Sequence, residues 1–551
     1  MTVSPVTFSI ITTAFVAIAR EMSADFRRVA FSSSIREAGD ASTAVLDSGG
    51  NVIAQAENIP IHLNSMGPAL QACLNQCPLE ELRMGDVLIN NDPYSGAQHL
   101  SDIFLFSPVF VDGEVVAFSA STGHYADLGG SPGFFLMAKD VYQEKLRFEP
   151  MKFSIERDWN GGLLERLIRS NVRLPRDVIG DFNAQLTANA KGVNRLSSLI
   201  EKYGLETIRE CMDGYLCSAD KSLRATIAML PDGEFTGQDV VDDDGTNDNP
   251  IVIRVTVKKV GDQLFVDFAG TDRQKETAIN CPFASTLGAV MTAVKMTLSD
   301  PNFPFNDGFN RPVQVTASSG SIVNPEKPAP CEGRHLVAIR VFQAMIKALA
   351  QLVPDKVAAT GYDTRTSTRF YNPIPGGYQC FQDSLGGGYG AFPFGDGESQ
   401  LDDPLGNCRN TPIEMFEAGQ DFFRVIAYDL ISDSGGAGKY RGGLGARRVY
   451  EILKDGILFT VASDRFKNRS EGLMGGEPGT CETISIQRGC EQLSFPSKFM
   501  TTLQKGDVVE IRIGGGAGWG DPAERDKAAV EYDLVEQKIS PDYARRFHGM
   551  R

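Results

Sequence analysis

The 551-residue sequence predicts a mixed α/β (α+β) protein in which several antiparallel sheets and hairpins are covered by helices. Two β-prone runs, residues 103–111 and 114–121, flank an Asp-Gly pair at 112–113, which is typical of a two-residue hairpin turn. Apolar residues recur at helical spacing over residues 8–29 and again through residues 161–230. Because no repeat or low-complexity linker separates these segments, we expect several domains that are intertwined.

Four segments follow one another along the chain. We predict an N-terminal metal-binding α+β region, a helical layer, a β-rich domain with helices and glycine-rich loops, and a helical C-terminal tail, at residues 1–160, 161–230, 231–522 and 523–551. The first region begins with the 8–29 helix and contains the central hairpin. In the β-rich domain, a second hairpin is expected to turn at Gly261-Asp262.

Composition narrows the class of protein. The formal net charge of −16 argues against nucleic acid and against an anionic membrane as partners, since both require basic surface. The ten cysteines include no Cys-x-x-Cys pair, which is typical of reduced thiols in a cytoplasmic protein. Residues 8–29 lack the basic start of a signal peptide and are interrupted by Arg20-Glu21, so we read them as a helix with one buried face.

Chemistry-bearing side chains are expected to meet at the open end of the central hairpin. With residues 112 and 113 as the tip, Asp102 lies opposite Gly123 and His124 lies opposite Ser101. Facing Cα atoms in such a pair are about 4.5–5.5 Å apart, so His99, Asp102 and His124 could share one ion. Pro108 cannot donate to the ladder, so it indicates a bulge or an edge strand and a register that can slip by one residue.

Two imidazoles and a carboxylate suit a transition metal, zinc ahead of manganese or iron, better than calcium or magnesium. Asp40 stands just before the first strand of an earlier hairpin and is either a fourth ligand or a turn former. His62 either lines the site or is a structural histidine. The alternative for His99 and His124 is that they are polar core or loop residues. Their convergence on one hairpin end leads us to favour a metal.

The glycine clusters of the C-terminal third do not match a phosphate-binding loop. Gly438-Lys439 is followed by Tyr440, and no glycine precedes this pair at the spacing of a P-loop. No Gly-x-Gly-x-x-Gly turn joins a clear strand to a helix. We therefore interpret these clusters as tight turns of a sheet-rich domain.

Short motifs along nearly the whole chain resemble one family, the B (β) subunits of ATP-dependent hydantoinases, 5-oxoprolinases and lactamases. The α subunits of acetone and acetophenone carboxylases are more distant members of it. The matching motifs are IREAGD, NDPY, HLSD, HYADLGG, NTPIE, DSGG, KYRGGLG and GGGAGWGDP, at residues 35–40, 91–94, 99–102, 124–130, 410–414, 433–436, 439–445 and 514–522. Residues 331–335 (CEGRH) depart from the common family pattern.

The resemblance implies metal ligands at Asp40, His99, Asp102 and His124, with Asp127 as a catalytic-site residue that orients His124. It also implies that Mg-ATP binds a hydantoinase A-like α subunit rather than this chain, in an (αβ)2 assembly. The implied reaction is the ATP-dependent opening of a lactam, hydantoin or 5-oxoproline ring, on a substrate or bicarbonate carrier activated by the partner.

Two other functions remain open from the sequence. One is a subunit of an ATP-dependent ketone carboxylase, which would have the same metal site. The other is a non-catalytic scaffold whose ion only stabilises the partner. In the hydrolase, Asp127 or His62 is the candidate proton carrier.

Overall fold

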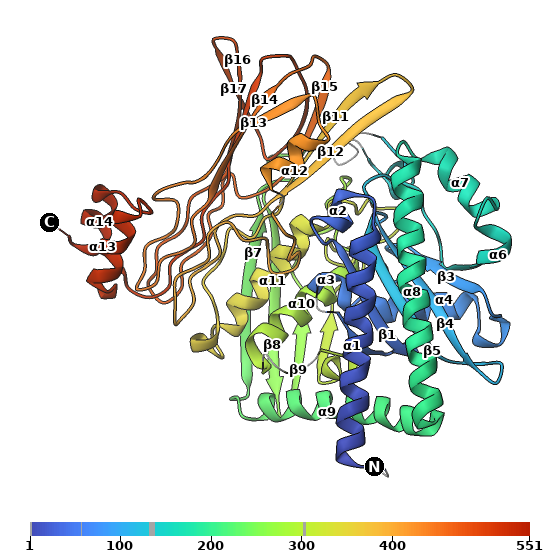
Figure 1. Ribbon diagram of the computed structural model, residues 1–551. Coiled ribbons are helices and arrows are strands. Elements are labelled where there is room, and N and C mark those ends of the chain that lie inside the picture. The colour runs from blue at the N-terminus through green and yellow to red at the C-terminus, as the bar shows by residue number, and fades with distance from the viewer. Residues whose placement is uncertain are drawn as a thin grey trace. The chain divides into compact units, whose positions relative to one another are not determined.

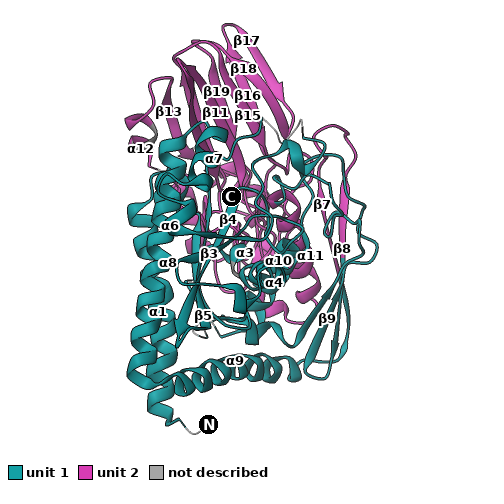
Figure 2. Ribbon diagram, turned by 90° about the vertical axis from the view of Figure 1, so that its right-hand side faces the viewer, with its two compact units in different colours: residues 1–131, 138–236, 255–334 teal, residues 132–137, 237–254, 335–551 magenta. Residues whose placement is uncertain are grey.

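The computed structural model describes residues 3–56, 58–131, 138–300, 303, 305–410 and 412–550. They form two compact units (Figure 2), of which unit 1 contains residues 1–131, 138–236 and 255–334, and unit 2 contains residues 237–254 and 335–551. The chain enters unit 2 within strand β7 (Gly233–Val241) and returns within strand β8 (Ile251–Val260). The units are thus intertwined in sequence, and their boundaries divide the predicted 231–522 segment between them.

Unit 1 is built on an antiparallel sheet with the strand order β2-β1-β5-β4-β3-β6. Its strands are β1 (Ala41–Asp47), β2 (Val52–Gln55), β3 (Asp86–Asn90), β4 (Asp102–Val111), β5 (Glu114–His124) and β6 (Met151–Ser154). Helix α1 (Pro5–Val29) contacts β1, and α8 (Pro175–Tyr203) contacts β4 and β5 (Figure 1). Helix α4 (Met66–Gln76) contacts β3 and β4. The predicted α+β class is confirmed.

Strand β4 is apolar on both faces because helices cover both. Ile103 and Leu105 belong to the same core cluster as Phe182 of α8. Phe104 and Phe106 alternate with them and pack in a second cluster with residues of α4. The uninterrupted apolar run that the sequence shows here is therefore an interior strand buried from both sides.

The β4–β5 hairpin has the predicted turn but not the predicted register. Asp112 and Gly113 both adopt positive φ, as a type I′ turn requires. A bulge between Val109 and Phe110 shifts the pairing, so that Asp102 faces His124 directly. The predicted pairing of Asp102 with Gly123 is wrong by one residue, because β5 carries an extra residue near its start. The shift brings the two ligand candidates closer together.

Helix α8 fixes this hairpin with polar side chains as well as apolar ones. Gln185 Nε2 donates hydrogen bonds to the carbonyl oxygens of Ile103 and Ser121, at 2.9 and 3.0 Å. Asn189 Nδ2 donates to the carbonyl oxygen of Leu105 at 3.0 Å. All these groups are buried, where an unpaired polar group would be destabilising. The helix therefore holds the two strands in a defined position.

Helix α1 buries the face that the sequence predicts. Ile11, Phe15, Ile18, Met22 and Phe26 are at most 2% exposed and lie in one core cluster. By length and composition, α1 is also the one helix among the described residues that could cross a membrane.

The remainder of unit 1 is largely helical. Helices α2 (Ser33–Arg36), α3 (Pro60–Leu63), α6 (Ile155–Asp158), α7 (Leu163–Asn171), α9 (Leu205–Ala228) and α10 (Phe283–Leu298) complete it. A further sheet has the order β10-β9-β8-β7, with β9 (Gln263–Asp267) antiparallel to β8 and parallel to β10 (Val313–Thr316). The predicted Gly261-Asp262 hairpin is therefore confirmed.

Unit 2 contains two antiparallel sheets that share an aromatic core. One has the order β12-β11-β15-β18 and the other β13-β14-β19-β16-β17. Phe370 of β11 lies 5.6 Å from Phe423 of β13 and 5.2 Å from Tyr450 of β14, measured between ring centroids. The strands are β11 (Thr366–Ile374), β12 (Gly377–Leu385), β13 (Phe423–Leu430), β14 (Ala446–Ile452), β15 (Ile457–Ala462), β16 (Thr483–Arg488), β17 (Glu491–Phe495), β18 (Lys498–Leu503) and β19 (Val508–Arg512). Helices α11 (His335–Leu349), α12 (Ile413–Ala418), α13 (Lys527–Val535) and α14 (Pro541–His548) accompany them.

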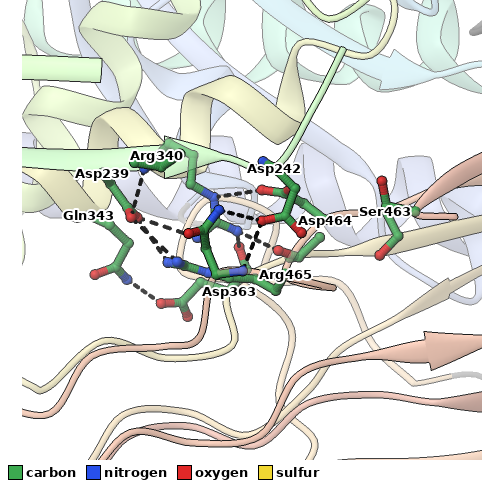
Figure 3. A network of polar contacts seen from close by, with 12 residues as sticks. Asp239, Asp242, Arg340, Gln343, Asp363, Ser463, Asp464 and Arg465 are labelled. Atoms are coloured by element: carbon green, nitrogen blue, oxygen red, sulfur yellow. Dashed lines mark hydrogen bonds and ion pairs between the residues drawn. The ribbon is translucent and has the colours of Figure 1, made fainter. Parts of the chain in front are cut away.

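A buried ion network ties α11 to strand β7 and to the loop that follows β15 (Figure 3). Arg465 Nη2 lies 2.9 Å from Asp239 Oδ2, and Arg340 Nε lies 3.3 Å from Asp464 Oδ2. Burial favours a higher pKa for Asp239, but Arg465, Lys347 and Arg340 outweigh it and hold that pKa below its usual value. Because Arg340 and Arg465 each pair with aspartates, we interpret the network as structural.

The glycine clusters of unit 2 form a bundle of extended segments, residues 386–391, 433–445, 470–480 and 514–520. Three consecutive backbone N–H groups donate to three different neighbours: Gly516 to Gly443, Ala517 to Thr360, and Gly518 to Glu477. Successive N–H groups that point to three different neighbours indicate three residues per turn. That is the geometry of a polyproline II helix rather than of a sheet strand. The expectation of tight turns is confirmed at a few positions, such as Met474-Gly475, where both residues adopt positive φ, but most of these residues lie outside turns. The missing Cβ atoms allow backbones to touch.

We predict that Gly516→Ala lowers the free energy of unfolding by about 3 kcal/mol, the upper end of the usual range for overpacking, because rigid backbone cannot move aside. An added Cβ would lie 2.0 Å from the carbonyl oxygen of Tyr389. Gly395→Ala is the matched control in the same unit, since nothing lies within 4 Å of its Cβ position. Urea denaturation of both variants tests this, and equal midpoints would contradict the packing argument.

Candidate metal centre

Three of the predicted ligands meet at the open end of the β4–β5 hairpin. Asp102 begins β4 and His124 ends β5, and the two residues are register partners. His99 precedes β4 by one turn, in which the Asp102 N–H donates to the His99 carbonyl at 3.1 Å. One ligand atom from each of the three residues lies within 4.8 Å of the others. We call this group the hairpin site.

The Asp102 carboxylate is the centre of the hairpin site. Its Oδ1 lies 3.2 Å from His124 Nδ1, and its Oδ2 lies 3.0 Å from His99 Nε2. The two imidazole rings are 5.1 Å apart between centroids. Asp102 is fully buried, and both histidines are less than a tenth exposed. The three side chains are close enough to bind one ion.

Asp40 and His62 border the same site. The β1–β5 pairing places the Asp40 carbonyl 3.0 Å from the His124 N–H, and Asp40 Oδ2 is 4.0 Å from His124 Nδ1. His62 of α3 directs Nε2 toward two carboxylates, 3.3 Å from Asp102 Oδ2 and 3.7 Å from Asp40 Oδ1. Of the two readings of His62, the structure favours a residue that lines the site. Whether Asp40 is a ligand stays a prediction.

The ionisable groups of the site shift one another's pKa values. Burial favours a higher pKa for Asp102, but His99, His62 and the hydrogen bond from His124 outweigh it and hold that pKa well below its usual value. Burial lowers the pKa of His124 in spite of the neighbouring carboxylates. At His99, burial also favours a lower pKa, but Asp102 and Glu332 outweigh it and raise that pKa. An ionised carboxylate next to a neutral imidazole is the protonation state that binds a metal.

The donor atoms fit a divalent transition metal. Nε2 of His99 and Nε2 of His124 are both buried, and neither makes a hydrogen bond of good geometry to any residue the structure describes. Buried polar atoms normally have partners, so such atoms call for an ion or another ligand. Two imidazole nitrogens and carboxylate oxygen form a donor set of the kind that zinc, manganese and iron prefer.

The structure adds three residues that the sequence analysis missed. Glu332 lies behind His99, with its carbonyl oxygen 3.2 Å and its Oε2 3.3 Å from His99 Nδ1. Lys145 Nζ pairs with Glu332 Oε1 at 2.7 Å, and Arg334 Nη2 pairs with Asp102 Oδ2 at 3.0 Å. With Nδ1 donating to Glu332, the Nε2 lone pair of His99 is left for a metal. The one sequence signal was the unusual CEGRH stretch at residues 331–335.

Asp127 is held by a different partner from the one predicted. Its Oδ1 pairs with Arg173 Nη1 at 3.0 Å and accepts the Gly129 N–H at 3.0 Å. Its Oδ2 accepts the backbone N–H groups of Arg173 and Leu174. Among the described contacts of His124, the carboxylates are those of Asp102 and Asp40. The geometry favours a structural anchor over an orienting or proton-carrying role for Asp127.

Comparison with known proteins identifies relatives along the whole chain. The family model for hydantoinase B/oxoprolinase matches residues 4–522. A protein of Pseudomonas sp. (strain NS671), described as one subunit of a putative D-/L-hydantoinase, is 31% identical, and the match covers 100% of this chain and 95% of that protein.

Two solved structures share the fold. The crystal structure of ATP-dependent caprolactamase from Pseudomonas jessenii matches with a TM-score of 0.91 and 28% identity, over 100% of this chain and 96% of that one. A nucleotide-free acetone carboxylase matches with a TM-score of 0.89 over 99% of this chain and 79% of that one. At 17% identity, the second likeness shows the fold alone.

We predict that Asp127→Ala lowers the free energy of unfolding by about 2–4 kcal/mol, since it removes the acceptor of several partly buried hydrogen bonds. Metal content should stay unchanged. Denaturant unfolding and elemental analysis of the purified variant test both statements. Loss of metal with unchanged stability would show instead that Asp127 orients His124.

Proposed function

Because the chain belongs to the hydantoinase B/oxoprolinase family, we propose that it is the metal-binding β subunit of an ATP-dependent cyclic amide hydrolase. The single observation that carries this proposal is the convergence of His99, Asp102 and His124 on one buried point. The substrate class is a lactam, a hydantoin or 5-oxoproline. Support for this class comes from the names of two relatives, a hydantoinase subunit and an ATP-dependent caprolactamase.

The metal centre consists of His99, Asp102 and His124 with Asp40 as the fourth ligand, and zinc suits it ahead of manganese or iron. Such an ion supplies a Lewis acid for a carbonyl oxygen and lowers the pKa of a bound water. An amide carbonyl is a weak electrophile, so the site also needs a substrate that has already been activated.

The protein's own residues orient the ligands and exclude water. Glu332 accepts the Nδ1 proton of His99 and so fixes which nitrogen faces the site. The hairpin site is almost completely buried, which strengthens every electrostatic interaction inside it. His62 Nε2, 3.3 Å from Asp102 Oδ2, is the histidine placed closest to the ligands without belonging to the three-residue group. We assign the role of proton carrier to His62 rather than to Asp127.

We place ATP on a hydantoinase A-like α subunit, in an (αβ)2 assembly in the cytoplasm. The glycines of residues 514–518 support that placement, because neighbouring backbone occupies the space next to them. At Gly516, for example, an added Cβ would lie 2.0 Å from a carbonyl oxygen. The Pseudomonas relative is named as one subunit of its enzyme, which is consistent with a partner chain.

The test is an assay of the chain co-expressed with its α subunit against lactams, hydantoins, 5-oxoproline and ketones, with and without bicarbonate. We expect ring opening that requires ATP and metal, and we expect calorimetric titration of this chain alone with Mg-ATP to be flat. Carboxylation of a ketone without ring opening would favour the carboxylase. Full activity after metal removal would favour the alternative in which this chain is a non-catalytic scaffold.

We further predict that His124→Ala holds less than about a tenth of an equivalent of metal and has background activity, because one of two imidazole ligands is gone. Stability should fall by about 2–4 kcal/mol if the ion binds only the folded state. Inductively coupled plasma analysis, thermal melting and turnover of the complex measure this. His548→Ala in unit 2 is the control and should keep its metal. A metal-replete His124→Ala with turnover within about tenfold of wild type would remove His124 from the site.

A further inference from the structure

Arg334 is the one cation in contact with the central carboxylate of the hairpin site, apart from the histidines, among the contacts described. Its Nη2 lies 3.0 Å from Asp102 Oδ2, and the side chain is only 3% exposed. It belongs to the CEGRH stretch, more than 200 residues along the chain from Asp102. A buried guanidinium is costly unless it is paired and hydrogen-bonded. The presence of a buried arginine next to the proposed metal ligands therefore calls for an explanation.

The backbone that carries Arg334 is held firmly. Glu144 Oε1 accepts the N–H groups of Cys331 and Glu332 at 2.8 and 2.7 Å. The Arg334 N–H donates to the Cys331 carbonyl at 3.1 Å, which closes a turn. Glu144 and Glu332 are fully buried. A side chain on such a support can be pre-organised for a ligand.

The guanidinium has donor capacity that its protein contacts do not use. Arginine presents five N–H donors in a planar fork that matches the oxygens of phosphate and carboxylate groups. Arg334 Nε is buried and makes no hydrogen bond to any residue in the described part of the chain. The same side chain contacts Asp102 Oδ2 at 3.0 Å, and His99 Nε2 lies 3.0 Å from that same oxygen. The unused Nε–H therefore belongs to a side chain of the hairpin site.

The charge of the site also favours an anion once a metal is present. The ion-paired residues of the cluster are three carboxylates, Asp40, Asp102 and Glu332, and two cations, Lys145 and Arg334. With neutral histidines, and with the buried carboxyl of Glu144 protonated as its raised pKa favours, the formal charges sum to −1. A divalent ion changes that value to +1. In a buried site, an uncompensated charge is unfavourable, and a bound anion restores neutrality.

We propose that Arg334 is the anion-binding residue of the hairpin site, where it and the metal together take a small oxyanion. The inference rests on the metal centre proposed above and adds to it the chemical class of the ligand. A phosphoryl group carried by an activated substrate and a bicarbonate ion share this chemistry. The competing role for Arg334 is only to neutralise Asp102, in which case its spare Nε has no ligand.

The experiment uses the full-length chain loaded with cobalt, whose absorption bands respond to changes in metal coordination. Inorganic phosphate and bicarbonate are titrated in separate arms at constant ionic strength, with cobalt content measured in every sample. The variants are Arg334→Ala, Arg334→Lys, which keeps the charge but loses the fork, and Arg147→Ala. Arg147 is a partly buried arginine of unit 1 that pairs with Asp92 and Glu149, and serves as the matched control.

We expect a saturable spectral change for the wild type with at least one anion, and the arm that saturates identifies the source. Arg334→Ala and Arg334→Lys should each raise the apparent Kd at least about tenfold with cobalt retained, while Arg147→Ala stays within about twofold. A wild type that keeps cobalt but responds to neither anion would overturn this inference and leave the metal centre standing. So would Arg334 variants that bind as the wild type does. Failure of the wild type to hold cobalt would overturn the metal centre and this inference together.

Discussion

The burial of the Asp102 carboxylate is the constraint on which the site depends. An isolated carboxylate in a protein interior is unfavourable by several kcal/mol, so cationic or hydrogen-bonding groups must reach it. The fold supplies His99, His124 and His62 from the N-terminal region and Arg334 from a segment far along the chain. Because these groups surround a single carboxylate, the hairpin site forms only when most of unit 1 is folded.

The scaffold explains why these side chains can be held at fixed positions. Strand β4 is interior to its sheet and covered on both faces, and Gln185 of α8 bonds carbonyl groups of both hairpin strands. The open end of the hairpin is therefore a rigid edge rather than a mobile loop. A metal site gains precision when its ligands stand on such elements, since their rotamers are fixed by packing. The second layer, Glu332 and Lys145, continues this support outward from His99.

Local patterns were enough to predict the centre of the site but not its surroundings. The Asp-Gly turn between two β-prone runs brings Asp102 and His124 together by geometry alone, although the bulge at Val109 and Phe110 shifted the register by one residue. Glu332 and Arg334 could not be found in this way, because no periodicity links a loop at residue 332 to a hairpin at residue 102. The family resemblance assigned Asp127 to His124, whereas the folded chain offers it Arg173 and two backbone N–H groups. The prediction for the glycine clusters was incomplete for another reason. The conformation of these residues depends on close packing between chain segments, which composition does not reveal.

The claim that one transition metal binds at the end of the β4–β5 hairpin is tested most directly by anomalous diffraction. Crystals of the co-expressed complex would be measured on both sides of the zinc absorption edge, without added metal. The account predicts one strong anomalous peak in each copy of this chain, about 2.0–2.2 Å from an imidazole nitrogen of His99, an imidazole nitrogen of His124 and a carboxylate oxygen of Asp102. A fully active complex with no peak at that position, or with its metal held by cysteine sulfurs elsewhere, would contradict it.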